Sequence, residues 1–116
     1  MQYNSTRNNN IKVSSAMAIK QGLSEEGGLF VPENFPKVEL SEISDLSKKS
    51  YNERAYFVLN KFLTDFSTED LKNCISSAYT KEKFGTDAIA PVYKLNNSAY
   101  FLPDNLHAQS TVPLQK

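Results

Sequence analysis

The residues best suited to chemistry lie near the end of the chain, in HAQSTVPLQK. His107 is the one histidine among the 116 residues, and Ser110 and Thr111 follow it closely. Asp104 lies three residues before it, which makes a single His–carboxylate pair and falls short of the ligand set of a zinc site. A hydrolase triad must converge in space, and adjacency along the chain does not supply that. The sequence therefore predicts no metal site and no catalytic triad.

The remaining motifs also favour structure over catalysis. No phosphate-binding loop of the G-x-G-x-x-G or G-x-x-x-x-G-K type is present. Glu25 and Glu26 precede a glycine pair, and we expect them to be solvated rather than to work as an acid–base pair. Cys74 stands alone, which excludes an internal disulfide. Thirteen basic and thirteen acidic residues cancel, so no field favours nucleic acid or an anionic membrane.

Composition places the chain among globular domains. It is 40% hydrophobic and 22% charged, as ordinary globular proteins are. No stretch of about 18 apolar residues could span a membrane, and MQYNSTRNNN lacks the apolar run of a secretory signal. We expect one domain at most, located in the cytoplasm, with neither membrane nor nucleic acid as a partner.

Short elements are predicted to position the N-terminal residues. A first strand is expected in MQYNSTR, followed by a turn at 8–10. Ser14 or Ser15 can cap a helix over about 15–21, with Gly22 as the residue that ends it. Gly27-Gly28 predicts a turn with a positive φ at Gly28, and LFVP predicts a strand that Pro32 ends.

The middle of the chain predicts helices, and its last third predicts a hairpin. SEISDLSKK indicates a short helix. Ser50 and Glu53 form a capping box for a helix over about 51–63, and Ser67 starts the next one. Two β-prone runs then surround Asn96–Asn97, which favours a hairpin.

These elements predict an α+β fold, a small sheet of short strands packed with three or four helices. We expect the N-terminal strand, LFVP and the late hairpin to share that sheet. Residues 1–103 would form the domain, and 104–116 would form an irregular C-terminal tail. The expected core consists of Ile19, Leu29, Val31, Val58, Phe62, Leu71, Ile75, Val92 and Phe101.

The order of four motifs is more specific than any one of them. Tyr3, Ser5, Thr6 and Arg7 give Y-x-S-T-R; Gln21–Leu23 give Q-G-L; Glu26–Pro32 give E-G-G-L-F-V-P; Ala90–Val92 give A-P-V. This order resembles the N-terminal part of threonine synthase, a pyridoxal-phosphate-dependent family. Glu26 stands where that family usually has aspartate.

The resemblance breaks at the family's H-G-P-T box. His107 matches its histidine, but Ala108 and Gln109 replace the Gly-Pro. The family's catalytic lysine lies seven residues after the histidine, where this chain has Leu114. Lys116 lies two positions further on, so we do not expect it to be the lysine that binds the cofactor.

The resemblance implies a lyase of threonine biosynthesis, which converts O-phosphohomoserine to threonine and phosphate. The chain lacks that enzyme's catalytic domains, so the resemblance implies no catalytic residue, no bound cofactor and no activity in the chain alone. Ser5, Thr6, Arg7 and His107 would lie at the edge of the active site. The fork of Arg7 suits a phosphate or carboxylate, and fixing a strand end is its alternative role.

Two hypotheses remain open. In the first, the chain is the N-terminal domain of a threonine synthase, its partners are the catalytic domains of the same enzyme, and residues 104–116 begin the missing part. Its uncovered face could then self-associate. In the second, it is a stand-alone, non-catalytic interaction module that binds a protein partner. Whether the natural polypeptide ends at Lys116 distinguishes them.

Overall fold

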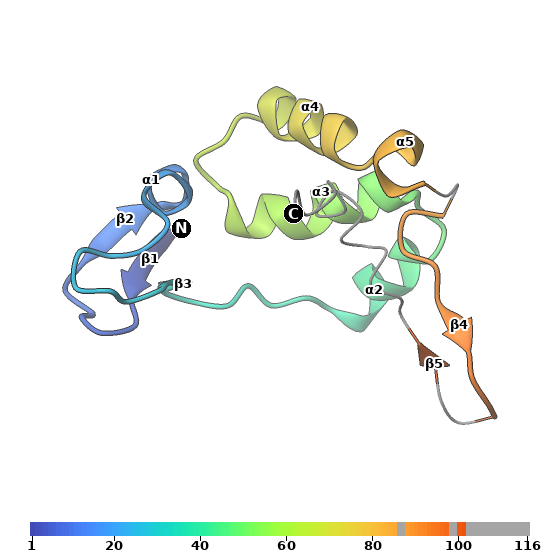
Figure 1. Cartoon of the computed structure of the whole chain (residues 1–116), viewed down its shortest axis with the longest axis horizontal. Coiled ribbons are helices and arrows are strands. Elements are labelled where there is room, and N and C mark those ends of the chain that lie inside the picture. Colours follow the sequence, from blue (N-terminus) through green and yellow to red (C-terminus); the bar gives the residue numbers. More distant parts are fainter. Residues whose placement is uncertain (86–87, 98–99, 102–116) are drawn as a thin grey trace, which may run out of the picture. The chain divides into compact units, whose positions relative to one another are not determined.

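The computed structural model describes residues 1–85, 88–97 and 100–101. Contacts divide the chain into two units, Met1–Lys72 and Asn73–Lys116. The elements in chain order are β1 (Gln2–Ser5), β2 (Lys12–Ser14), α1 (Ser15–Gln21), β3 (Phe30–Pro32), α2 (Leu40–Leu46), α3 (Tyr51–Phe62), α4 (Thr68–Ala78), α5 (Lys81–Phe84), β4 (Tyr93–Lys94) and β5 (Tyr100–Phe101) (Figure 1). The predicted α+β class is confirmed, with α5 as a short helix that the sequence patterns did not indicate.

The N-terminal sheet has three antiparallel strands in the order β2–β1–β3. Tyr3 in the central strand pairs with Val13 on one side and with Pro32 on the other. Proline is tolerated in β3 because an edge strand leaves one side of its backbone unpaired. The turn at 8–10 is confirmed, since the Asn10 N–H donates to Asn8 Oδ1 at 3.0 Å. β2 was not predicted, because three residues are too few to show an alternating pattern.

Helix α1 begins and ends where the sequence predicts. Ser14 Oγ accepts from the Met17 N–H at 3.2 Å, which satisfies a donor that the first turn leaves free. Gly22 follows the helix with φ 76° and ψ −67°, and the Leu23 N–H donates to the Gln21 carbonyl at 3.0 Å. This γ-turn with positive φ is strained for any residue with a Cβ, which explains the glycine.

The predicted caps of the middle helices are also confirmed. The Glu53 N–H donates to Ser50 Oγ at 3.3 Å, and the Ser50 N–H donates to Glu53 Oε2 at 2.8 Å. At the start of α4, Ser67 Oγ accepts from the Asp70 N–H at 3.1 Å. The bonds between Ser50 and Glu53 are the reciprocal pair of a capping box. At α4 the Asp70 carboxylate instead accepts from the Ser67 hydroxyl, and both caps depend only on residues three apart.

Arg54 of α3 closes the C-terminal end of α2. Its Nε donates to the Leu46 carbonyl at 2.8 Å, and a terminal nitrogen donates to the Ser47 carbonyl at 2.9 Å. The last carbonyls of a helix have no partner within the helix. The Arg54 side chain, which comes from the following helix, therefore donates hydrogen bonds that α2 itself does not supply to these carbonyls.

Residues 62–65, which are the last residue of α3 and the three that follow it, are bonded to the N-terminal sheet and its helix. Three donors reach this segment: the Met1 amino group to Thr64 Oγ1, the Tyr3 hydroxyl to the Phe62 carbonyl at 2.9 Å, and the Ala16 N–H to Asp65 Oδ2 at 2.9 Å. Burial, with the Asp65 charge, raises the pKa of the Tyr3 phenol. Tyr3 therefore stays protonated and donates across the neutral range.

The late hairpin does not join the N-terminal sheet, and that prediction was wrong. β4 and β5 pair with each other, Tyr93 opposite Phe101, as a separate two-stranded sheet. These two strands are close in sequence and pair locally, whereas pairing with the N-terminal sheet would have to close a loop over most of the chain. The antiparallel pairing itself is confirmed.

The predicted core is right at Leu71 and Ile75, each 3% exposed, and Ala18 and Phe84 are also buried. Phe62 is only half-buried. The prediction was wrong for five residues that are 40–63% exposed: Ile19, Leu29, Val31, Val58 and Val92. Periodicity tells which residues share a face, and it cannot tell whether anything covers that face. The side chain of Phe101 lies outside the described residues.

Candidate functional site

The glycine pair forms a closed turn beside β1. The Gly27 N–H donates to the Ser24 carbonyl at 2.8 Å, and the Ser24 N–H donates to the Gly28 carbonyl at 2.9 Å. Gly27 has φ 82°, and Gly28 has no positive φ. The expectation of a positive φ at Gly28 was therefore wrong by one residue.

Position 28 requires glycine because a side chain there would have no room, and not because the backbone needs a positive φ. A Cβ at this position would lie 2.1 Å from Ser5 Oγ and 3.2 Å from the Arg7 backbone nitrogen. Real Cβ atoms do not approach other heavy atoms that closely. Gly27 therefore supplies the positive φ of the turn, and Gly28 leaves the space that β1 needs to approach the turn.

Glu26 joins the turn to the strand. Its carboxylate accepts from the hydroxyls of Ser24 and Ser5, and its side chain is half-buried. It is therefore not the freely solvated residue that the sequence predicted. The hydroxyls of Ser24 and Ser5 hold the pKa of Glu26 below its usual range, with help from its own backbone N–H and from Arg7. An ionised carboxylate only accepts hydrogen bonds, so at neutral pH Glu26 binds these groups and donates no proton.

Because the folded-state pKa of Glu26 lies below the usual 4.5, this carboxylate stabilises the fold above about pH 4.5 and stops doing so as the pH falls through the folded-state pKa. We expect Glu26→Gln to lower stability at pH 7 and to flatten the loss of stability on acidification. Urea unfolding of the 116-residue chain between pH 7 and pH 3 measures this.

Glu25→Gln is the matched control, since it removes the same charge from an exposed neighbour outside the network. Some acid sensitivity should remain in every variant, because backbone N–H groups at Glu39 and Ser50 lower the pKa of Glu42 and Glu53. Equal pH profiles for the Glu26 and Glu25 variants would contradict a role for Glu26 in the turn.

Ser5, Thr6 and Arg7 each contact this turn differently. Ser5 is 0% exposed, and its hydroxyl donates to the Glu26 carboxylate. Thr6 pairs with Leu29: its Oγ1 accepts from the Leu29 N–H at 3.0 Å, and its own N–H donates to the Leu29 carbonyl at 2.8 Å. The exposed Arg7 donates from one terminal nitrogen to the Glu26 carbonyl at 2.8 Å.

Arg7 keeps donors free for another partner. Its guanidinium lies against Gly27, where an added Cβ would be 3.1 Å from the bonded nitrogen. Its Nε and second terminal nitrogen make no hydrogen bond to the described residues. His107, the fourth residue predicted at this edge, lies outside the described residues.

Ser24 was not singled out from the sequence. Its hydroxyl reaches the carboxylate two residues later, which is the kind of local bond that serine often makes in turns. The S-x-E-G-G spacing was therefore a usable signal for the local half of the network. The bond from Ser5, which lies 21 residues away, has no such signal.

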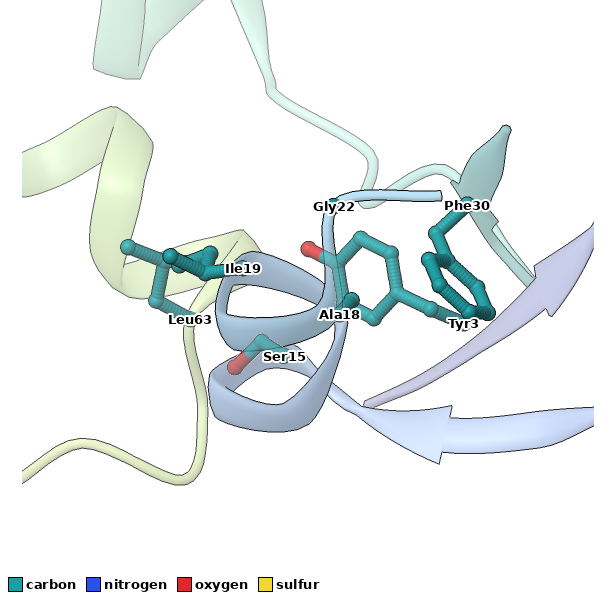
Figure 2. Close-up of a pocket in the computed structure, with 7 residues that line it drawn as sticks. All are labelled: Tyr3, Ser15, Ala18, Ile19, Gly22, Phe30 and Leu63. Atoms are coloured by element: carbon teal, nitrogen blue, oxygen red, sulfur yellow. The ribbon is translucent and has the colours of Figure 1, made fainter. Parts of the chain in front are cut away.

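A hollow of about 180 Å³ lies between β1, α1 and the end of α3 in the same unit. Figure 2 shows the residues that line it, with the aromatic rings of Tyr3 and Phe30 on one side and Ile19 and Leu63 on the other. Ser15, Ala18 and Gly22 of the α1 segment complete the lining. The hollow is apolar apart from two hydroxyls.

The described part of the chain holds no cluster of three or more His, Cys, Asp or Glu side chains that could bind a metal. Within residues 1–85, 88–97 and 100–101, no helix is both long and apolar enough to cross a membrane. Cys74 is exposed and forms no disulfide with a described residue.

The chain therefore contains a small α+β domain. In this domain the Glu26 carboxylate binds the glycine turn to the end of β1, and Arg7 stays exposed beside the turn. Residues 2–79 match the family model described as threonine synthase N terminus. The chain belongs to that family, which confirms the resemblance seen in its motifs.

Relatives of the chain are much longer than it is. It is 29% identical to threonine synthase of Methylobacillus glycogenes over 88% of this chain and 23% of that protein. It is 33% identical to threonine synthase of Pseudomonas aeruginosa over 88% of this chain and 22% of that protein. The crystal structure of PLP-bound threonine synthase from Brucella melitensis aligns with TM-score 0.79 and 30% identity over 88% of this chain and 22% of that one. The chain thus spans less than a quarter of these relatives.

Proposed function

We propose that this chain is the N-terminal domain of an enzyme that converts O-phosphohomoserine to threonine and phosphate with pyridoxal phosphate, and that the 116 residues alone are inactive. The observation that carries the proposal is the match of residues 2–79 to the family's N terminus. The fit to only 22% of the Brucella melitensis chain supports it further. Cytoplasmic location is part of the same proposal.

The hollow beside α1 does not fit the cofactor. The hollow beside α1 is lined by no charged side chain, whereas pyridoxal phosphate carries a phosphate and a ring nitrogen that need charged or strongly polar partners. We therefore assign the cofactor to the catalytic domains, and we assign no step of its chemistry to this chain.

Exposed apolar residues support the catalytic domains as partners. Ile19, Leu23 and Leu29 are 63%, 54% and 60% exposed, and Leu23 and Leu29 face each other in an isolated bridge. Apolar side chains that are exposed together are typical of contact surfaces. In the isolated chain, we expect this face to promote self-association, which sedimentation at increasing concentration would detect.

We place Arg7 at the edge of the active site, with its unbonded nitrogens toward the phosphate or carboxylate of the substrate. Its exposure and its free donors support this role. Ser5 and Thr6 then act at that edge indirectly, because their hydroxyls are bonded inside the turn and set the position of Arg7.

In the long polypeptide, Arg7→Lys should raise KM for O-phosphohomoserine about tenfold or more, since lysine keeps the charge and loses the fork that binds an oxyanion at two points. Steady-state phosphate release measures KM, and thermal unfolding measures the structural effect. A lower Tm with unchanged KM would mean that Arg7 only fixes the strand end.

The proposed function itself is tested by the size of the natural protein. An immunoblot of the source cells against this domain should give a band about four times larger than the 13.1 kDa of the chain, given the 22–23% coverage of its relatives. The purified long protein should release phosphate from O-phosphohomoserine, and the 116-residue chain should not. A single band at 13.1 kDa would support the stand-alone interaction module instead.

A further inference from the structure

Glu26 is connected to Arg7 in two ways. Its carboxylate accepts from the Ser5 hydroxyl, and Ser5 Oγ in turn accepts from the Arg7 backbone N–H at 3.2 Å. Its backbone carbonyl accepts directly from one terminal nitrogen of Arg7 at 2.8 Å. Glu26 therefore acts on both the main chain and the guanidinium of this exposed arginine.

The charge of Glu26 sets the direction of the first connection. Hydrogen bonds from the hydroxyls of Ser24 and Ser5 hold the pKa of Glu26 below its usual range, so its carboxyl group is ionised at neutral pH. An ionised carboxylate only accepts, so Ser5 must donate its single hydroxyl proton to Glu26. The lone pairs of Ser5 Oγ then accept from the Arg7 N–H.

The side chain of Glu26 also restrains its own backbone carbonyl. Its two carboxylate oxygens bind different hydroxyls, Oε1 that of Ser5 in β1 and Oε2 that of Ser24 in the turn. The turn itself is closed by the backbone bond from Ser24 to Gly28. A residue held at both carboxylate oxygens keeps its carbonyl aimed at the Arg7 guanidinium.

These contacts leave the bidentate edge of the guanidinium open. Glu26 binds it through the backbone carbonyl and not through the carboxylate, and the bonded nitrogen is Nη1. Nε and Nη2 form the edge that binds an oxyanion at two points, and neither bonds to a described residue. A side chain that is already held loses less freedom when it binds a ligand, which favours binding.

We propose that Glu26 is a positioning residue, which holds the guanidinium of Arg7 with its Nε–Nη2 edge open toward an oxyanion of the substrate. This inference rests on the proposed function, because that reaction supplies the phosphate and the carboxylate that such an edge binds. Glu26 touches no substrate in this role and acts only through Arg7. The two connections from one residue to Arg7 carry the inference.

The mobility of the Arg7 guanidinium tests the positioning directly. Arg7 and Arg54 are the two arginines of the chain, and NMR relaxation of their Nε–H groups in the 116-residue chain reports motion on the ps–ns timescale. Glu26→Ala should make the Arg7 group clearly more mobile. Arg54 is the internal control, since carbonyls at the end of α2 hold it, and its mobility should not change.

Two further variants complete the NMR test. Glu26→Gln should mobilise Arg7 in the same direction but less, because an amide still accepts from one hydroxyl, and it decides the matter if Glu26→Ala does not fold. Glu25→Ala is the matched control, since Glu25 is exposed and outside the network, and it should leave Arg7 unchanged. Unchanged Arg7 mobility in the folded Glu26 variants would overturn the inference.

In the long polypeptide, Glu26→Ala should raise KM for O-phosphohomoserine about threefold to tenfold, the loss expected for one hydrogen bond. kcat should change little, because the oxyanion is bound alike before and during the reaction. When Arg7→Ala is already present, adding Glu26→Ala should no longer alter KM. An equal rise of KM with and without Arg7, or a lower Tm with unchanged KM, would overturn the inference.

Failure of the proposed function would look different. The unchanged long protein would then release no phosphate from O-phosphohomoserine, and the substrate part of the inference would fail with it. The mobility of Arg7 in the 116-residue chain would still show whether Glu26 holds the arginine. If phosphate is released and Glu26→Ala changes neither Arg7 mobility nor KM, the inference fails and the proposed function stands.

Discussion

Gly28→Ala is expected to cost about 3 kcal/mol or more, the upper end of what overpacking causes. The new methyl would lie 2.1 Å from Ser5 Oγ and 3.2 Å from the Arg7 nitrogen. Ser5 cannot move aside easily, because it is 0% exposed and bonded to Glu26. The strand and the turn must therefore separate. Urea unfolding of the 116-residue chain measures the loss.

A second substitution tests the cause. Ser5→Ala removes the atom that the new methyl would strike, at the lesser cost of two hydrogen bonds, one to the Glu26 carboxylate and one from the Arg7 N–H at 3.2 Å. The double variant, Ser5→Ala with Gly28→Ala, should therefore be more stable than Gly28→Ala alone, which is a strongly non-additive pair. If the two losses simply add, the close approach of Ser5 and Gly28 is not the reason for the glycine.

Leu71→Ala is expected to destabilise the chain by about 3 kcal/mol, within the usual 2–5 kcal/mol for truncating a buried leucine. Leu71 is 3% exposed and is one of the few buried apolar residues in the part of the chain that the structure describes. The loss combines the lost burial with the cavity left behind, which a small core refills poorly. Equilibrium urea unfolding at neutral pH gives the free energy.

Val58→Ala is the matched comparison. The sequence pattern predicts both residues in the core, but Val58 is 48% exposed. Alanine is also the better helix former, so this change in α3 should cost less than about 1 kcal/mol or even stabilise. A larger loss at Val58 than at Leu71 would show that the apolar pattern, and not the observed exposure, identifies the core.

What could be predicted from the sequence was mostly local. Ser50 with Glu53, and Ser67 with Asp70, signal caps through residues three apart, and the structure contains both bonds. The end of α1 at Gly22 is local in the same sense. Such features depend on side chains that reach their own backbone, so no knowledge of the tertiary structure is needed.

The rest depended on contacts between distant residues. The motif resemblance pointed to Ser5, Thr6 and Arg7, but not to the bond from Ser5 to Glu26, 21 positions away. The need for glycine at position 28 has the same origin, because it comes from the close approach of Ser5 and not from the backbone conformation of the turn. The role of His107 and the domain end at residue 103 stay predictions, since residues 102–116 lie outside the described residues.

The bonds from the N-terminal sheet to residues 62–65 bear on the order in which the chain can fold during synthesis. Tyr3 and Phe62 are 59 positions apart, and Ala16 and Asp65 are 49 positions apart. Helices α2 and α3 are local structures that form quickly, whereas contacts over such separations close slowly. All three strands of the N-terminal sheet have been synthesised once the ribosome reaches Pro32. The residues that they bond to, 62–65, are synthesised about thirty residues later. We therefore expect the shortest N-terminal fragment that contains these bonding partners of the sheet to end at Asp65.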